Sequence, residues 1–282
     1  RNAMNRRTFL KTSAGVAVAA AVAGVPAPAG EFTGKLKKAV KYNMIRMDAT
    51  PLEKLRLLKE LGFDGVEPKF DEKVDPEELL AASKETGVEI HGVVLGRADD
   101  IPAAVDRAKF YGASSVLVVA GRVDENNYYA ENYKTTQAKV REALPHAEEQ
   151  RILLLVENVW NNFLLSPLEM ARYLDELDSE WVGAYFDIGN VVRFGWPEHW
   201  ISALGPRVKK LDVKEYDRKK QLNEGLWKGF EAKIGDGSVD WAAVRKELAG
   251  IGYSGWATAE VGGGDKARLA DIAARMDKVL DL

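Results

Sequence analysis

The sequence predicts an α/β fold, a closed (β/α)₈ TIM barrel, and three observations support this prediction. Eight short apolar segments alternate with helical segments over most of the 282 residues, which is the pattern of a parallel barrel. No glycine-rich phosphate loop follows an early strand, which disfavours the alternative, an open doubly wound sheet. The third observation is that several helices end on a glycine directly before a strand, at Gly62, Gly87, Gly112 and Gly252.

The first residues read as a targeting sequence. Arg1-Asn2-Ala3 precede Met4 and are interpreted as a cloning remnant. The pair Arg6-Arg7, the apolar run 14–25 and the small residues Ala27-Pro28-Ala29 together resemble a twin-arginine export signal with its cleavage site. An uncleaved membrane anchor is the alternative, but the apolar run is shorter than the roughly 20 residues that a spanning helix needs.

We therefore expect residues 1–29 to be this remnant plus a signal peptide, and 30–282 to be a single exported domain, periplasmic or secreted. Cleavage would remove four basic residues and no acid, which changes the formal net charge from −3 to −7. That balance argues against nucleic acid or an anionic membrane as a partner. The chain has no cysteine, so disulfides and thiolate metal sites are excluded within it. A homo-oligomer remains open.

Four strand–helix units are expected in the first half of the chain. Thr50, Pro51 and Glu53 have the spacing of a capping box with proline at the first helical position. The expected strands are 38–44, 63–67, 88–95 and 114–120, and the expected helices are 51–62, 76–86, 101–111 and 128–149.

The second half carries four more strands, and each bears an acid at or near its end. The expected strands are 152–158, 182–187, 208–214 and 254–260, and the expected helices are 167–177, 200–204, 241–249 and 266–279. The corresponding acids, in chain order, are Glu157, Asp187, Asp212 and Glu260.

These four acids predict a divalent metal site. Active sites of such barrels lie at the carboxyl ends of the strands, so acids on four successive strands would be neighbours there. Like charges so close together raise each other's pKa, and a bound cation removes the repulsion. Any one of these acids has the alternative of being a helix cap or half of an ion pair. Four at matching positions favour the metal site.

At these positions the sequence resembles the xylose isomerase-like family of barrels, the sugar phosphate isomerases and epimerases, including ketose 3-epimerases. The resemblance implies a metal held by Glu, Asp, His and Glu on the last four strands, so Asp212 stands where the family usually has a histidine. Asn190 stands where a substrate-contacting histidine often lies. The segments that carry the resemblance are Val156-Glu157-Asn158, Phe186-Asp187-Ile188-Gly189-Asn190, 212–218, 234–241, Thr258-Ala259-Glu260 and, earlier in the chain, 62–67.

The resemblance also implies the chemistry. In the family the glutamates that match Glu157 and Glu260 flank the sugar and serve as base and acid from opposite faces. The metal polarises a carbonyl and stabilises an enediolate during proton transfer, which is the chemistry of a sugar or keto-sugar isomerase or epimerase. With Asp212 in place of histidine the ligands are all oxygens, which favours Mg²⁺ or Mn²⁺, or else Ca²⁺, over Zn²⁺.

Five further residues are expected at the substrate. Arg218 matches a substrate-contacting arginine of the family, and Asn190 is placed there by the same resemblance. Lys214 either touches a substrate oxygen or neutralises its neighbour Glu215. His91 either lies at the mouth of the barrel or is a satisfied interior histidine. Glu67 ends the second strand and is expected to contact the substrate or to support a ligand.

Several alternatives remain open at this point. Trp160, Trp196 and Trp227 either stack on a sugar or pack in the core, and Gly262-Gly263-Gly264 either approaches a phosphate or forms a turn. The runner-up activity is a lyase, which would eliminate a β-substituent from a 3-keto-glycoside or dehydrate an inosose at the same site. A carbohydrate-binding barrel without catalysis is the non-enzymatic alternative. An apurinic endonuclease of the same family needs several histidines for its metals. It is disfavoured because this chain has only three histidines and an acidic charge balance.

Overall fold

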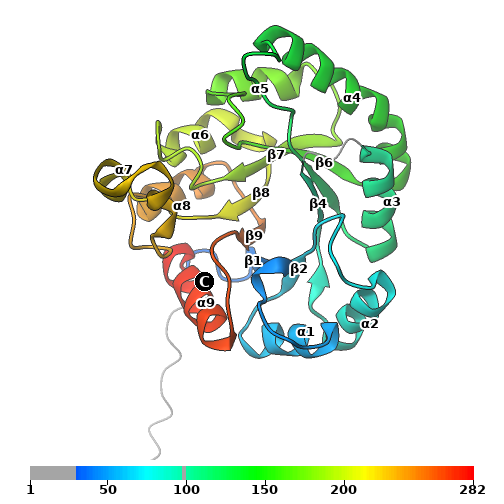
Figure 1. Ribbon diagram of the computed structural model, residues 1–282, viewed down its shortest axis with the longest axis vertical. Helices are drawn as coiled ribbons and strands as arrows, with labels where there is room; N and C mark the ends of the chain where they lie inside the picture. Colours follow the sequence, from blue (N-terminus) through cyan, green and yellow to red (C-terminus); the bar gives the residue numbers. More distant parts are fainter. Residues whose placement is uncertain (1–29, 97–99) are drawn as a thin grey trace, which may run out of the picture.

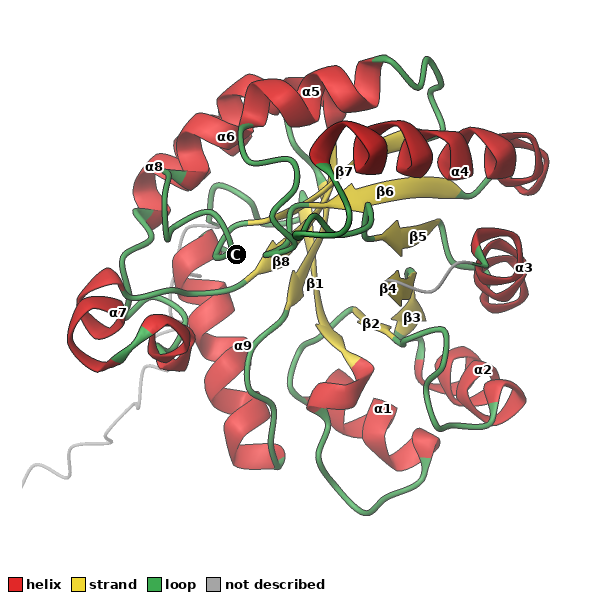
Figure 2. Cartoon of the chain, turned by 45° about the horizontal axis from the view of Figure 1, so that its top comes forward, coloured by secondary structure: helices red, strands yellow, loops and turns green. Residues whose placement is uncertain are grey.

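The computed structural model describes residues 30–96 and 100–282, which form a barrel of parallel strands with helices around it (Figure 1). Figure 2 shows the same arrangement from a second direction, with the strands at the centre and the helices outside. The predicted (β/α)₈ barrel is confirmed. The expected signal peptide and its cleavage site, at 1–29, lie outside the described residues.

The strands lie close to their expected positions and pair in parallel throughout. They are β1 (Leu36–Lys41), β2 (Gly65–Glu67), β3 (Glu89–Ile90), β4 (Val93–Gly96), β5 (Ser115–Val118), β6 (Leu153–Glu157), β7 (Val182–Asp187), β8 (Val208–Val213) and β9 (Gly255–Ala259).

The nine strands occupy the eight strand positions of the barrel, because β3 and β4 are two halves of the predicted third strand. The sheet runs from β3 through β2, β1, β9, β8, β7, β6 and β5 to β4, so its two ends are consecutive in the chain. The break falls at His91 and Gly92. A Cβ on Gly92 would lie 2.2 Å from Glu67 Oε1 and 3.1 Å from Ser115 Oγ, so a side chain has no room there. The uninterrupted strand expected at 88–95 was wrong in this respect.

Several helices begin and end where local signals place them, whereas the helix expected at 200–204 begins earlier, at Pro197, without a side-chain cap. The predicted capping box is present, since Glu53 N donates to Thr50 Oγ1 and Thr50 N donates to Glu53 Oε2. Gly87 and Gly112 cap their helices at φ 71° and 72°. The helices are α1 (Pro51–Glu60), α2 (Pro76–Thr86), α3 (Ile101–Tyr111), α4 (Tyr129–Gln150), α5 (Pro167–Asp175), α6 (Pro197–Leu204), α7 (Arg218–Glu224), α8 (Trp241–Gly250) and α9 (Lys266–Leu280).

Two segments at the mouth of the barrel differ from expectation. The first strand ends at Lys41, and Tyr42–Met44 form a 3₁₀ turn, η1, where 38–44 was expected to be extended. After β8 the chain forms α7 and a further 3₁₀ helix, η3 (Leu226–Glu231), neither of which was predicted. Both are too short to show a helical repeat of apolar residues. A third 3₁₀ turn, η2 (Gly205–Arg207), precedes β8.

The apolar core lies between the strands and the helices, whereas the barrel interior is largely polar. Inward-facing Leu117, Leu155 and Tyr185 form a small cluster apart from the main core. Buried Lys41 and Lys210 share this interior with other polar side chains. Within 30–96 and 100–282, no helix combines the length and apolarity needed to cross a bilayer.

Candidate metal centre

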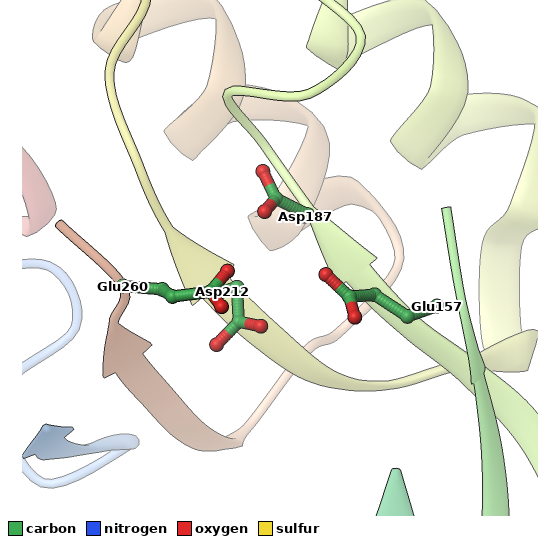
Figure 3. A group of neighbouring side chains, drawn as sticks. All are labelled: Glu157, Asp187, Asp212 and Glu260. Carbon is green, nitrogen blue, oxygen red and sulfur yellow. The ribbon is translucent and has the colours of Figure 1, made fainter. Parts of the chain in front are cut away.

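Four carboxylates meet at the carboxyl end of the barrel. Glu157 is the last residue of β6, Asp187 is the last residue of β7, and Asp212 lies opposite Asp187 in β8. Glu260 directly follows β9. Each offers an oxygen within 4.8 Å of the others (Figure 3). The sequence predicted this convergence because parallel strands in register bring their carboxyl ends to one edge.

Two asparagines fasten the ends of β6 and β7. The Asn158 side chain donates to Asp187 O and accepts from Asp187 N, both at 2.8 Å. Asn190 Nδ2 donates to Asn158 O, and Asn190 N donates to Asp187 Oδ1 at 2.8 Å. The side-chain nitrogen of Asn190 is therefore already hydrogen-bonded to a backbone carbonyl. The residue nevertheless lines the pocket described below, as expected of a substrate contact.

Two ammonium groups lie against the carboxylates. Lys214 Nζ is 2.7 Å from Asp187 Oδ2 and 2.6 Å from Glu260 Oε2. Lys41 Nζ is 2.9 Å from Asp212 Oδ1. Lys214 does not neutralise Glu215, one of the two roles expected for it. The Glu215 carboxylate instead accepts four hydrogen bonds, from Tyr216 N, Gly235 N and Val239 N between β8 and α8 and from Trp241 Nε1 at the start of α8.

Buried carboxylate oxygens favour a cation in this group. Among the described residues, Asp187 Oδ2, both Asp212 oxygens and Glu260 Oε2 are buried without a hydrogen bond. Three of these oxygens lie against the ammonium groups of Lys214 and Lys41, whereas Asp212 Oδ2 has no ion pair either. Buried carboxylate oxygens in this condition are costly unless a positive charge meets them. A divalent cation with oxygen ligands would satisfy all of them together.

The charge balance points the same way. Glu67 lies just below the four carboxylates, so five acids face three buried or nearly buried lysines, the third being Lys210. Burial lowers the pKa of Lys210 to about 8, which leaves it mainly cationic at neutral pH. With all five acids ionised, two negative charges are in excess, and one divalent ion would balance them.

The four carboxyl groups differ in their protonation behaviour. Burial, with the charges of Glu260 and Asp212, raises the pKa of Glu157 well above its usual range. Burial likewise raises the pKa of Asp212 strongly, against the opposing effect of Lys41, and raises that of Asp187 to about 6. Burial would also raise the pKa of Glu260, but the ammonium groups of Lys214 and Lys41 outweigh it and lower that pKa.

His91 and Glu67 belong to the barrel interior, below the carboxylates. His91 stacks on Trp256 with ring centroids 4.3 Å apart, and its ring nitrogens lie 3.0 Å from Lys210 Nζ and 3.1 Å from Thr258 Oγ1. Burial lowers the pKa of His91 well below its usual value, so the ring is neutral. Of the two roles expected for His91, the structure shows the interior one: the residue is buried and does not line the pocket, so its expected place at the mouth was wrong.

Glu67 is fully buried and is bound by the protein itself. Its Oε2 accepts from Lys41 Nζ at 2.6 Å and from Tyr185 OH at 2.9 Å. These contacts place Glu67 beneath the predicted ligands as a supporting acid, and not at the substrate.

Arg218 is held away from the pocket. Its Nε donates to Val192 O at 2.8 Å and its Nη2 donates to Gly195 O, while the guanidinium lies 4.9 Å from the Trp196 ring centroid. Arg218 is not among the residues that line the pocket. In this structure it fastens the loop after β7 and does not reach toward a substrate as expected.

A pocket of about 510 Å³ opens above the carboxylates. Polar groups line its floor, including Glu157, Asn190, Lys214 and Glu260, and aromatic rings line one wall. Trp160 and Trp227 belong to this wall, whereas Trp196 does not. Sequence reasoning also missed further lining residues, among them Asn43, Met44, Arg46 and Phe230, which lie in η1, η3 and the loop after η1, where the sequence carries no motif.

The glycine run after β9 packs against the loop after β1. Gly264 N donates to Met44 O at 2.9 Å, and a Cβ on Gly263 would lie 2.1 Å from the same oxygen. Gly264 thus bridges to Ile45 in parallel, and Gly262 lines the pocket, so the two expected roles of the run stay predictions.

Known proteins share this fold or part of this sequence. A curated relative from Escherichia coli (strain K12), named "Putative L-ribulose-5-phosphate 3-epimerase SgbU", is 26% identical over 232 residues, which are 72% of this chain and 80% of the relative. The crystal structure of D-allulose 3-epimerase from Methylomonas sp. in complex with D-allulose shares the fold at a TM-score of 0.71 and 18% identity, over 86% of this chain and 96% of that one. The probable 3-DHS dehydratase AsbF of Bacillus anthracis shares it at a TM-score of 0.70 and 14% identity, over 84% and 97%.

Two sequence families match the chain. The twin-arginine translocation signal matches residues 3–23, so the chain carries a signal for export across the membrane, as predicted. The family described as Xylose isomerase-like TIM barrel matches residues 55–279, which is most of the chain. On that match, the protein belongs to the xylose isomerase-like TIM barrel family.

Proposed function

We propose that this protein is a divalent-metal-dependent isomerase or epimerase of a sugar or keto-sugar, which moves a proton at a carbon next to a carbonyl. One observation carries the proposal: four carboxylates offer oxygens within 4.8 Å of one another, and two of them, Glu157 and Glu260, line a pocket of about 510 Å³. The curated relative is named as a sugar-phosphate epimerase, which supports the same class.

The four carboxylates divide into two pairs. Asp187 and Asp212 are fully buried and do not line the pocket. We therefore assign them to binding the cation and to no other role. Glu157 and Glu260 line the pocket and approach the group from opposite sides (Figure 3). We assign these two glutamates to proton transfer as well, one on each face of the substrate.

A bound cation would polarise the substrate carbonyl and stabilise negative charge on its oxygen. The chain would orient the substrate through Lys214, whose ammonium lies at the pocket floor beside Glu260. The donor set consists of carboxylate oxygens, which favours Mg²⁺ or Mn²⁺ over Zn²⁺.

Deuterium exchange tests the assignment of the two glutamates. Glu157→Gln and Glu260→Gln keep the side-chain size and remove the proton-transfer group, so each is expected to abolish incorporation of solvent deuterium into a keto-sugar. Glu77→Gln, on the exposed first turn of α2, serves as the matched control. Full exchange in both site variants would remove these glutamates from the mechanism.

Metal analysis tests the cofactor independently of activity. Elemental analysis of purified protein is expected to find Mg²⁺ or Mn²⁺, and stoichiometric Zn²⁺ would contradict this. A ligand that binds the native state at 100 times its dissociation constant adds about 2.7 kcal/mol of stability. Added Mn²⁺ should therefore raise the thermal midpoint of protein treated with a chelator, and Asp187→Asn should remove that rise.

Elimination is the second candidate activity, because two carboxylates on opposite sides of a substrate can also remove a proton and protonate a leaving group. The probable 3-DHS dehydratase AsbF has the same fold, which supports this candidate. Mass spectrometry of products separates the two: an epimer keeps the substrate's mass, whereas a lyase product loses water or an aglycone. A barrel that only binds carbohydrate would show neither product nor exchange.

The place of action is proposed to be the periplasm or the exterior of the cell. The match to an export signal at residues 3–23 supports this. Replacing Arg6 and Arg7 by lysine should retain the protein in the cytoplasm with its signal uncleaved, as fractionation would show. Equal export of the variant would contradict the assignment.

A further inference from the structure

Three aromatic side chains form the outer wall of the pocket: Trp160 from the loop after β6, and Trp227 and Phe230 from η3. We call this set the aromatic wall. The ring centroids of Trp160 lie 4.9 Å from Trp227 and 4.8 Å from Phe230. All three side chains line the pocket, and Trp227 is 67% exposed. An exposed tryptophan at this position offers a free ring face to a ligand.

The aromatic wall is firmly anchored from behind. Trp160 Nε1 donates to Asn190 O at 2.8 Å, which fixes the indole relative to the end of β7. Buried Tyr216 packs edge-on against Trp160 and Phe230, and its hydroxyl hydrogen-bonds Leu226 O at 2.8 Å. The wall is therefore tied both to the barrel and to η3, so a ligand would meet rings that are already in place.

The wall begins beside the carboxylates and continues outward. Phe230 lies with its ring centroid 5.6 Å from Lys214 Nζ, the ammonium that contacts Asp187 and Glu260. Trp227 follows Phe230 at a centroid distance of 6.2 Å. A sugar whose carbonyl reaches the carboxylate group would lie near Phe230. The exposed face of Trp227 is one ring further out and is left for another part of the ligand.

The size of the pocket agrees with a ligand longer than one sugar ring. Its volume of about 510 Å³ lies within the roughly 300–1,000 Å³ of sites that enclose drug-sized ligands. Across from the wall the pocket is lined by Asn43 and Arg46, both exposed. Arg46 forms no ion pair within the described part of the chain, so its guanidinium is available to ligand oxygens.

We propose that the substrate is a two-ring carbohydrate, a glycoside or disaccharide, whose reacting sugar lies at the carboxylates while its second ring stacks on Trp227. This inference rests on the proposed function and adds the substrate class to it. The second ring can be an aromatic aglycone or another sugar, since both present a flat apolar face to an indole.

Binding measurements with defined probes test the proposal. Calorimetric titration of the Mn²⁺-loaded protein would use methyl β-D-glucoside as the one-ring probe, and phenyl β-D-glucoside and cellobiose as the two-ring probes. At least one two-ring probe should bind tenfold or more tightly than the one-ring probe. A preference for the phenyl compound identifies an aromatic aglycone, and a preference for cellobiose identifies a second sugar. If neither binds more tightly than the methyl glucoside, the proposal is wrong.

Two tryptophan variants locate the effect. Trp227→Ala should reduce the two-ring preference to less than threefold and leave methyl glucoside affinity unchanged. Trp196→Ala is the matched control, because Trp196 is 52% exposed on the neighbouring loop but does not line the pocket. An equal loss in both variants would contradict the assignment of the subsite.

These titrations require no turnover, so the two proposals can fail separately. If solvent exchange persists in the Glu157 and Glu260 variants while the two-ring preference is present, the catalytic assignment falls and the subsite stands. If exchange depends on the glutamates but no preference for two-ring probes is found, the catalytic assignment stands and the subsite proposal is wrong.

Discussion

Lys41 Nζ lies 2.9 Å from Asp212 Oδ1 and is fully enclosed by the barrel. The same ammonium is 2.6 Å from Glu67 Oε2 and 4.5 Å from the centroid of the Tyr185 ring. Two buried acids thus share one buried cation, which fixes the position of Asp212 and balances part of its charge. An aspartate can occupy this position among three other carboxylates because the lysine lies beneath it.

Replacing Lys41 by methionine should destabilise the fold strongly. Removing one partner of a buried ion pair leaves an uncompensated charge, which typically costs about 3–5 kcal/mol. Urea unfolding of Lys41→Met would measure the loss. Lys38→Met is the matched control, because Lys38 is also buried on β1 but pairs with Asp277, whose side chain is 48% exposed. A loss as large in the control would contradict the special role of Lys41.

Metal affinity should rise as the pH rises through the pKa of Asp187, about 6, and should continue to rise above it. Burial raises the pKa of Glu157 and Asp212 well above the usual carboxyl range, and that of Asp187 to about 6. A protonated carboxyl does not bind a cation, so the ion must displace protons, and fewer are present at higher pH. The pKa of Glu260 is lowered, so this group stays ionised and adds no dependence at that pH or above it.

Calorimetric titration with Mn²⁺ in two buffers of different ionisation enthalpy would count the protons released. An affinity that is independent of pH, with no proton release, would contradict the raised pKa values.

A methyl group at position 229 should disturb the aromatic wall. The Cβ of Gly229→Ala would lie 2.4 Å from Tyr216 Cε2 and 2.5 Å from its Cζ, so the ring that supports Trp160 and Phe230 must move. Overpacking of this kind typically costs about 1–3 kcal/mol, and two-ring ligands should bind several-fold more weakly. Thermal unfolding and the glucoside titrations measure both effects.

Gly250→Ala is the control for that substitution. Nothing lies within 4 Å of a Cβ at position 250, which is in the last turn of α8. Alanine there should be neutral or stabilising by up to about 1 kcal/mol. Equal effects of the two alanines would show that the Tyr216 contact is unimportant.

Removing the Arg218 guanidinium should affect stability more than metal binding. Arg218→Met loses the hydrogen bonds to Val192 O and Gly195 O, and unpaired carbonyls cost about 1–3 kcal/mol each when buried. Since Arg218 does not line the pocket, Mn²⁺ affinity should stay within about twofold of the wild type. A large loss of Mn²⁺ affinity in a variant of normal folding stability would contradict this expectation and would show that Arg218 acts at the metal site.

The barrel fold and the positions of the acids at its strand ends could be predicted without a structure. Thr50 with Glu53, and the glycines at 87 and 112, mark helix ends through contacts within a few residues, so they can be read without a structure. Glu157 and Asp187 follow from the same kind of reading, because an acid at the end of each parallel strand must reach the same edge of the sheet.

The tertiary structure alone decided which groups surround those acids. Lys41 forms an ion pair with Asp212, which is far from it in the sequence, and His91 contacts Thr258 inside the barrel. Trp160 packs against Trp227, which belongs to a different loop region. These contacts depend on strand register, barrel closure and loop path, which no spacing between neighbouring residues encodes. The ends of helices and strands are set locally, whereas the charge balance of the site and the shape of its pocket arise only when distant segments are packed together.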